Sequence, residues 1–354
     1  MTPPLPLLPL AALALLAFGV GFATQRGSVC GVLAARQIVE TRKTSRLVAF
    51  VLASLWALVV VVPLAWLIGD RLVLSPSYEG ISLALAGGAL YGLGTVINGA
   101  CVFGTVARTF SGNFAFLAAL PGIALGAGLG VTLGLPTLRS ARLPSPLSEP
   151  SLAGSALLIL SAALLLIALL GMLRGYRRAG IRLAQVLRAA RWRTSFAMMI
   201  IGVLGGLLFA IGGPWSYASL MRQLGQRAFG HEASFAASMI AGPLALMTGA
   251  AVAGLVGGRF ALRPIAARQV ARSLVGGAGM GLAATLVPGG NDVLLLSALP
   301  SLALHGALAY AAMLAVQIAI LSVAKRWKIA AASGGAWRTP SRRAPRAPRS
   351  RARV

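Results

Sequence analysis

The chain has 354 residues, of which 58% are hydrophobic and 11% charged, and its formal net charge is +26 at pH 7. A soluble globular chain carries about a quarter charged residues, so this composition excludes an ordinary soluble domain. A basic excess is also typical of nucleic-acid-binding proteins. Here the basic residues gather in a few segments between apolar runs, so we expect no nucleic-acid partner.

In chain order, apolar runs recur at lengths near the roughly 20 residues that cross a bilayer as a helix. We predict nine membrane-spanning helices, which cover residues 5–24, 47–68, 80–100, 114–135, 152–172, 195–212, 235–257, 273–289 and 302–323. Glycine is frequent inside these runs, as expected where helices pack closely in lipid. The sequence therefore predicts an all-α polytopic membrane protein.

Lysine and arginine gather in alternate loops. They cluster in residues 26–46, 174–193, 259–272 and 325–353, and the loops between these clusters are nearly neutral. Basic loops stay on the cytoplasmic side, so nine helices place the N-terminus outside and the C-terminus in the cytoplasm. Residues 325–354 are rich in arginine and proline, and we expect this tail to be disordered and to contact anionic membrane lipids.

Two segments that lie 189 residues apart are similar. The first begins GGALYGLG at Gly87 and the second begins GGAGMGLA at Gly276. We predict a first repeat over residues 1–136, a connector helix with a basic loop over 137–194, a second repeat over 195–324 and the tail over 325–354. One connecting helix inverts the second repeat, and inverted repeats place a transport path at their interface. Alternatively, such runs recur because small residues pack membrane helices in general.

Four short segments follow long apolar runs. They read GFATQRGSVCGVLAARQ, NGACVFGTVARTFSGN, IGGPWSYASLMRQLGQ and PGGNDVLLLSALP. Each is too short to cross a bilayer and too apolar for an ordinary loop. Glycine- and proline-interrupted segments of this kind form re-entrant half-helices around a pathway, and the starts of such helices offer N–H groups to an anion.

At these segments the sequence resembles the YeeE/YedE family of sulfur-compound transporters. The resemblance lies in GFATQRGSVCG and GLGTVINGACVFGTVAR in the first half, and in GGPWSYAS and GGAGMGLAATLVPGGN in the second. It covers nearly the whole chain except the basic tail. The family implies a bacterial inner-membrane importer of thiosulfate, in which cysteines along a narrow path pass the anion on. A cytosolic sulfurtransferase of the TusA type is a partner to expect.

The resemblance places Cys101 at the family's first Gly-Cys position, next to Gly99, Ala100 and Gly104. The corresponding position of the second half holds Gly290, so that thiol is absent. Cys30, in the first short segment, is a second candidate for the path. The alternative for a free cysteine is that it fills the core as a small apolar residue.

Further candidates for contact with an anion are Gln25, Arg26, Arg108 and Asn291. Alternatively, Arg26 and Arg108 mark the membrane boundary, where long basic side chains reach toward water. Asp292 opposes an anion path unless it is protonated, paired or facing away. We also expect Trp215 to lie in the interfacial aromatic belt.

The sequence holds no catalytic triad, paired carboxylates, metal-ligand cluster or phosphate loop, so we expect neither an enzyme nor a metal or cofactor. The predicted function is import of a small sulfur-containing anion, thiosulfate first, with Cys101 as a transient S–H donor. The alternatives are transport of hydrosulfide or of another sulfur or selenium species, and a membrane scaffold whose basic tail recruits a partner. The transport hypothesis requires a crevice that reaches Cys101 from one face.

Overall fold

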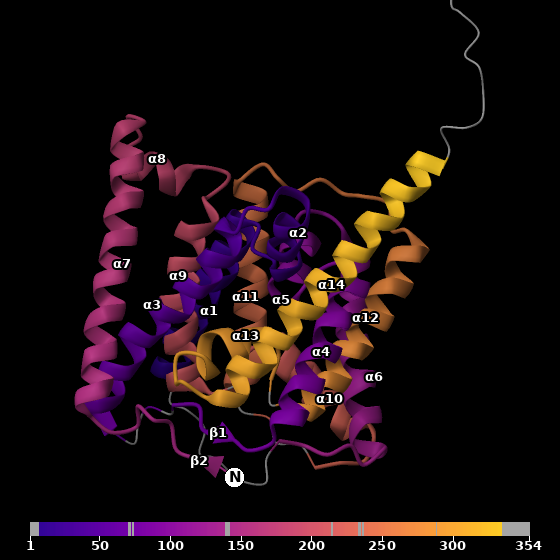
Figure 1. Ribbon diagram of the computed structural model, residues 1–354, viewed down its shortest axis with the longest axis horizontal. Helices are drawn as coiled ribbons and strands as arrows, with labels where there is room; N and C mark the ends of the chain where they lie inside the picture. The colour runs from indigo at the N-terminus through magenta and orange to yellow at the C-terminus, as the bar shows by residue number, and fades with distance from the viewer. Residues whose placement is uncertain are drawn as a thin grey trace, which may run out of the picture.

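The structure is a computed structural model that describes residues 7–69, 72, 74–138, 142–213, 215–232, 235, 237–287 and 289–334. Helices dominate the described residues (Figure 1). One short ladder joins β1 (Ser77–Tyr78) to β2 (Arg142–Leu143) in antiparallel register. The predicted all-α class is confirmed, with this ladder as a small addition between two loops.

Each of the nine predicted spans corresponds to a long helix. These are α1 (Leu7–Gly27), α3 (Ser45–Ile68), α4 (Ile81–Asn98), α6 (Ala119–Thr132), α7 (Leu152–Arg178), α9 (Thr194–Gly212), α11 (Ala237–Val256), α12 (Ala267–Leu286) and α14 (Leu304–Gly334). Among the described residues, eight helical stretches are long and apolar enough to cross a membrane, and a ninth arises if α12 is joined to the bent segment after it. Residues 5 and 6 of the first predicted span, and residues 335–354 of the tail, lie outside the described residues.

Short helices follow four of the long ones, as the interrupted segments predict. They are α2 (Gly31–Thr41) after α1, α5 (Val102–Thr109) after α4, α10 (Tyr217–Ala228) after α9, and α13 (Asn291–Val293) after α12. The last continues into a π-helical turn, η3 (Leu294–Ala298), and the whole segment is bent by 55° from α12. In Figure 1, α2 lies near the upper end of the molecule and α10 near the lower end.

Helices that correspond in the two halves make corresponding contacts. The first helix of each half packs on the second helix of the other half: α1 on α11, and α9 on α3. The third helix of each half packs on the fourth helix of the other half: α4 on α14, and α12 on α6. The corresponding helices α4 and α12 also pack on each other and run antiparallel, because Gly87 faces Val287 whereas Gly94 faces Gly276. Antiparallel pairing of equivalent helices is the arrangement that an inverted repeat produces. The domain boundaries at residues 136, 194 and 324 stay a prediction.

The glycines shared by the two similar segments sit at equivalent helix crossings. In each case an added methyl group would overlap backbone of the facing helix: Gly88 faces Ala309 and Gly92 faces Met313 across α4 and α14, while Gly277 faces Ala119 and Gly281 faces Ile123 across α12 and α6. Small residues let helix backbones approach this closely in lipid. The repeated glycines are therefore needed for packing in both halves.

The two ends of the molecule differ in charge. Helix α8 (Leu183–Arg188), the 257–266 segment and the C-terminal end of α14 lie at the upper end, whereas the β1–β2 ladder lies at the lower end (Figure 1). Three of the basic clusters predicted from sequence therefore share the upper end. Helix α7 stands at one side, contacts chiefly α3, and exposes apolar residues as a lipid-facing helix does.

One sequence prediction is wrong. Trp215 does not belong to an interfacial belt, because it is buried in the protein interior with 1% of its surface exposed. Its ring lies 5.3 Å from that of Phe209, at the end of α9. Helix α9 ends at Gly212, and the turn from α9 into α10 brings the indole inward, which the sequence pattern alone does not indicate.

Candidate functional site

The starts of four short helices meet inside the bundle. The residues that precede their first turns are buried: Cys30 before α2, Cys101 before α5, Ser216 before α10 and Gly290 before α13. Helix α5 contacts both α2 and α13, and the Tyr217 hydroxyl of α10 donates to the Val102 carbonyl of α5 at 2.9 Å. Segments from both halves of the chain therefore come together at these helix starts.

Cys30 and Cys101 form a pair of free thiols at the centre of this site. Their side chains are hydrogen-bonded to each other, and both residues are buried. The Gly31 backbone N–H donates to Cys101 Sγ at 3.0 Å. Gly104 faces Cys30 Sγ so closely that an added methyl group would overlap the sulfur. Glycine at position 104 thus gives room to the thiol of Cys30, not to that of Cys101.

A cavity of about 200 Å³ opens beside the pair. It is lined by residues from three segments: Ser28, Val29, Cys30, Leu33, Gly104, Ala107, Arg108, Ser111, Asn113, Arg259 and Arg263. Three of these are arginines and none is acidic. An anion in this cavity would meet positive charge and hydroxyl or amide groups before it reaches the Cys30 thiol.

The arginines of this cavity are held in defined positions. Arg259 donates from one nitrogen to the Ser28 hydroxyl at 2.7 Å and from another to the Gln25 carbonyl at 3.1 Å. Arg108 lies over the Phe116 ring, 5.0 Å from its centroid. Burial lowers the pKa of Arg259, and the nearby charges of Arg191 and Arg26 lower it further. An arginine stays protonated even so, and an anion would relieve the repulsion among these like charges.

The structure places Gln25 and Arg26 outside the cavity lining. Gln25 Nε2 donates to the Phe110 carbonyl at 3.1 Å, and Arg26 donates to the Ala189 carbonyl at 2.7 Å. Both residues are buried. They tie the end of α1 to the segments that follow α5 and α8, so their contacts are structural, and a contact with substrate stays a prediction.

Gly99 and Ala100 form the turn between α4 and α5. Gly99 has φ = +81°, in the left-handed region that favours glycine. The Asn98 amide donates to the Ala100 carbonyl at 2.8 Å and to the Thr105 hydroxyl at 2.9 Å. This turn reverses the chain so that Cys101 lies at the start of α5, and neither Gly99 nor Ala100 lines the cavity.

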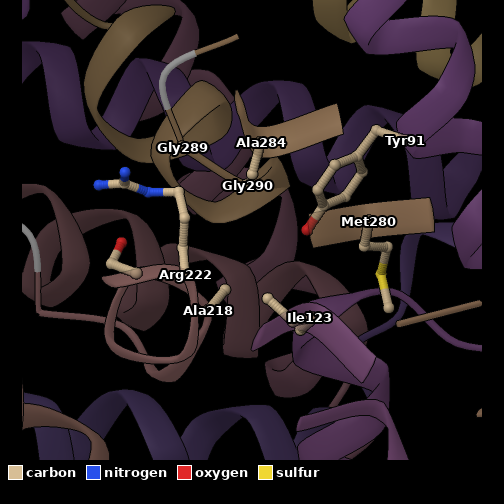
Figure 2. Close-up of a pocket in the computed structure, with 9 residues that line it drawn as sticks. Tyr91, Ile123, Ala218, Arg222, Met280, Ala284, Gly289 and Gly290 are labelled. Atoms are coloured by element: carbon tan, nitrogen blue, oxygen red, sulfur yellow. The ribbon is translucent and has the colours of Figure 1, made fainter. Parts of the chain in front are cut away.

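A second, smaller pocket lies on the other side of the helix starts, around Gly290 (Figure 2). Its volume is about 10 Å³, and its lining includes Tyr91, Ser219, Arg222 and Gly290. Figure 2 shows Tyr91 and Arg222 on opposite sides of the pocket, with Gly289 and Gly290 between them. The pocket is about as large as one water molecule requires, so this side of the site is nearly closed.

Cys101 lies between the two pockets and lines neither. Its exposed fraction is 0%, whereas Cys30, its hydrogen-bonded neighbour, lines the larger cavity. The crevice that the transport hypothesis requires at Cys101 is therefore not provided by either of these two pockets, and the larger one ends at Cys30. Passage of an ion beyond Cys30 requires the helix starts around Cys101 to move.

Several residues of the site are not identified by sequence reasoning. Arg259 and Arg263 belong to a basic loop whose charge is explained by the positive-inside pattern alone. Tyr91, Arg222 and Tyr217 lie within apolar or mixed segments that give no signal of their own. The repeat offers one signal: Arg222 and Gln223 follow Ser216 at the spacing at which Arg36 and Gln37 follow Cys30.

The fold and this site define a multi-pass membrane protein whose interrupted helices surround two buried thiols beneath an arginine-lined cavity. A family profile described as sulphur transport matches residues 26–319. The chain therefore belongs to the sulphur transport family, the YeeE/YedE family that its motifs resemble, which is a family of transporters and not of enzymes. A search of curated proteins finds no significant match.

Proposed function

We propose that the protein imports a small sulfur-containing anion, with thiosulfate as the first candidate. The path runs from the Gly290 pocket, past Cys101 and Cys30, to the arginine-lined cavity. The cavity side faces the cytoplasm of a bacterial cell across its inner membrane, because the basic loops lie at that end. The N-terminus is then outside and the C-terminus inside.

The observation that carries this proposal is the thiol pair whose Cys30 member lines the arginine cavity. Cys30 and Cys101 are hydrogen-bonded to each other across the starts of α2 and α5. A thiol is a weak donor, which suits a site that must bind an anion and then release it. The terminal sulfur of thiosulfate can accept such a hydrogen bond, and its oxygens suit the N–H groups of the helix starts and the guanidinium groups below.

The membrane potential opposes this import. Moving a charge inward against 100 mV requires about 2.3 kcal/mol, so a dianion requires about 4.6 kcal/mol. A thousandfold concentration gradient supplies about 4.1 kcal/mol. Rapid consumption of the anion in the cytoplasm, for example by a sulfurtransferase of the TusA type, would therefore offset most of the electrical term.

Hydrosulfide is the second candidate substrate. It carries one charge, so the opposing electrical term is halved. The absence of a thiol at position 290 favours it, since a smaller ion needs fewer S–H contacts along the path. The scaffold alternative has no comparable support, because a scaffold does not require buried thiols or helix starts that meet inside the membrane.

Uptake of labelled thiosulfate tests the proposal, in cells that lack other importers and express the wild type, Cys101→Ala or Cys101→Ser. We expect Cys101→Ala to lower the initial rate about tenfold, the equivalent of one lost hydrogen bond of about 1.4 kcal/mol. Ser238→Ala is the matched control, because its hydroxyl donates to the Gly212 carbonyl away from the path. Full uptake by both Cys101 variants at equal membrane abundance would count against the thiol path.

A further inference from the structure

A group of buried polar side chains surrounds Gly290, at the position where the first half has Cys101. Tyr91 comes from α4, Ser216 precedes α10, and Asn291 and Asp292 begin α13. All four are at most 3% exposed. The Ser216 hydroxyl lies near the Asp292 carboxyl, but neither carboxyl oxygen has a hydrogen-bond partner within the described residues. Within the described residues, neither amide atom of Asn291 has a hydrogen-bond partner.

These groups occupy the space of the missing thiol. A methyl group at Gly290 would lie 2.6 Å from Asp292 Oδ1 and 2.7 Å from the Tyr91 hydroxyl. A cysteine side chain at position 290 therefore does not fit beside this carboxyl and phenol. Where the first half has the thiol of Cys101, the second half therefore has an acid, a phenol and an amide around Gly290.

Asp292 carries a buried carboxyl group beside Gly290. The titratable groups around it are the Tyr91 phenol of α4, the Cys101 thiol of α5 and the Tyr217 phenol of α10. Three other helices pack against η3. Helix α9 carries no titratable residue, and α3 carries only Arg46, in its first turn. Helix α14 carries His305, Tyr310 and basic residues at its far end. Arg222 lines the neighbouring pocket. Phenols and ordinary thiols are neutral near pH 7.

The carboxyl lies on the proposed path. Tyr217 is close to both Asp292 and Cys101, and its hydroxyl donates to the residue that follows Cys101. In surroundings of low dielectric constant, an ionised carboxylate strongly repels an anion nearby. An anion can therefore occupy the Gly290 side only when Asp292 carries a proton. Buried acidic residues of membrane transporters commonly act in this way.

We propose that Asp292 is a proton-binding site that couples proton entry to anion entry. A proton from the outer side binds the Asp292 carboxylate, and the anion then binds next to the neutral carboxyl, the Tyr91 hydroxyl and the Asn291 amide. When the helix starts open toward the arginine cavity, the anion and the proton leave together. No bond of the substrate changes, and one proton lowers the net charge moved with a dianion from two to one. This inference rests on the proposed function and assigns its coupling ion.

The test measures labelled thiosulfate uptake into vesicles that contain the purified full-length protein, with the membrane potential clamped by valinomycin and equal potassium. We expect an inward-directed gradient of one pH unit to raise the initial rate of the wild type severalfold, up to tenfold. Asp292→Asn should lose the stimulation by the gradient, and Asp292→Glu should restore it. Size-exclusion chromatography and the unfolding temperature establish that each variant is folded.

The outcomes separate the two proposals. Wild-type uptake that is the same with and without the gradient would overturn proton coupling and leave the anion importer standing. Stimulation that persists in Asp292→Asn would show that another group binds the proton, which also overturns the assignment. A wild type that takes up no thiosulfate or hydrosulfide under any gradient would contradict both the function and its coupling.

Discussion

At the scale of single residues, the space around the Cys30 thiol depends on Gly104. An added methyl group at this position would overlap the sulfur. The two thiols are in contact, so a shift of Cys30 would also move its partner Cys101. The close approach of α2 and α5 thus positions the Cys30 thiol at the floor of the cavity, with the Cys101 thiol behind it.

We predict that Gly104→Ala lowers both the unfolding temperature and thiosulfate uptake. Overpacking in a tight interior destabilises by about 1–3 kcal/mol. The double variant Cys30→Ala, Gly104→Ala should regain part of the stability, because the sulfur is removed whereas the Cys30 Cβ stays 2.9 Å from the added methyl group. It should not regain the uptake, because the proposed path requires the Cys30 thiol. Gly171→Ala in α7 is the control, since an added methyl group meets nothing there. An unchanged unfolding temperature for Gly104→Ala would contradict the described contact.

Arg263 lines the cavity and adds a positive charge to it. We predict that Arg263→Gln raises the KM for uptake about fivefold, the equivalent of about 1 kcal/mol for one charge near an anion in water. The effect should diminish as salt is added, because mobile ions screen such an interaction. Arg178→Gln, at the exposed end of α7, is the control, because it also removes one positive charge. Equal KM values for the two variants would show that the cavity does not attract the substrate.

At the scale of helices, the two halves hold together through glycines that repeat with the sequence. Gly277 of α12 faces the backbone of Ala119 on α6, as Gly88 of α4 faces Ala309 on α14. Membrane helices gain stability from close packing, since lipid supplies little hydrophobic drive between them. Larger residues at these crossings would separate the helices that hold α5 and α13 in place.

Gly277→Leu should therefore lower the unfolding temperature strongly, and Gly88→Leu should act equally, because the two positions are equivalent in the repeat. Gly171→Leu, which adds the same side chain on the open face of α7, should leave the unfolding temperature nearly unchanged. A melting series on purified protein in one detergent compares the three. Equal melting of Gly277→Leu and Gly171→Leu would exclude the close crossing.

Much of the helical arrangement could be predicted from the sequence. The nine long helices follow from run length and composition, and the short helices follow from glycines and prolines that interrupt those runs. Cys101 could be placed at a helix start because Gly99 precedes it and permits the left-handed turn. The arginines of the cavity could not be assigned, since Arg259 lies 231 positions from the Ser28 hydroxyl that it binds. The burial of Trp215 could not be predicted either, because it depends on how α9 and α10 pack together.

At the scale of the whole molecule, charge separates the two ends. The basic segments around α8, in the 257–266 segment and at the end of α14 lie together (Figure 1). Among the acidic residues that the structure describes, Asp292 alone lies inside the bundle at a helix start. An orientation with the basic end in the cytoplasm follows from the positive-inside rule.

Labelling with a membrane-impermeant maleimide in intact cells tests this orientation. We predict that Glu149→Cys, before α7, reacts from outside, and that Arg188→Cys, in α8, reacts only after the membrane is opened. Both positions are exposed, and the native thiols are buried, so background labelling should be low. The reverse pattern would place the arginine cavity outside and contradict the direction of import.

The central claim is that a sulfur-bearing anion touches the thiol pair on its way through the protein. The most direct measurement is a structure determined with selenosulfate, in which the terminal sulfur of thiosulfate is replaced by selenium and is located by its anomalous signal. We expect the selenium within hydrogen-bonding distance of the Cys30 or Cys101 sulfur, with the oxygens toward Arg108 or Arg263. A selenium peak found only at sites remote from both sulfurs would contradict it.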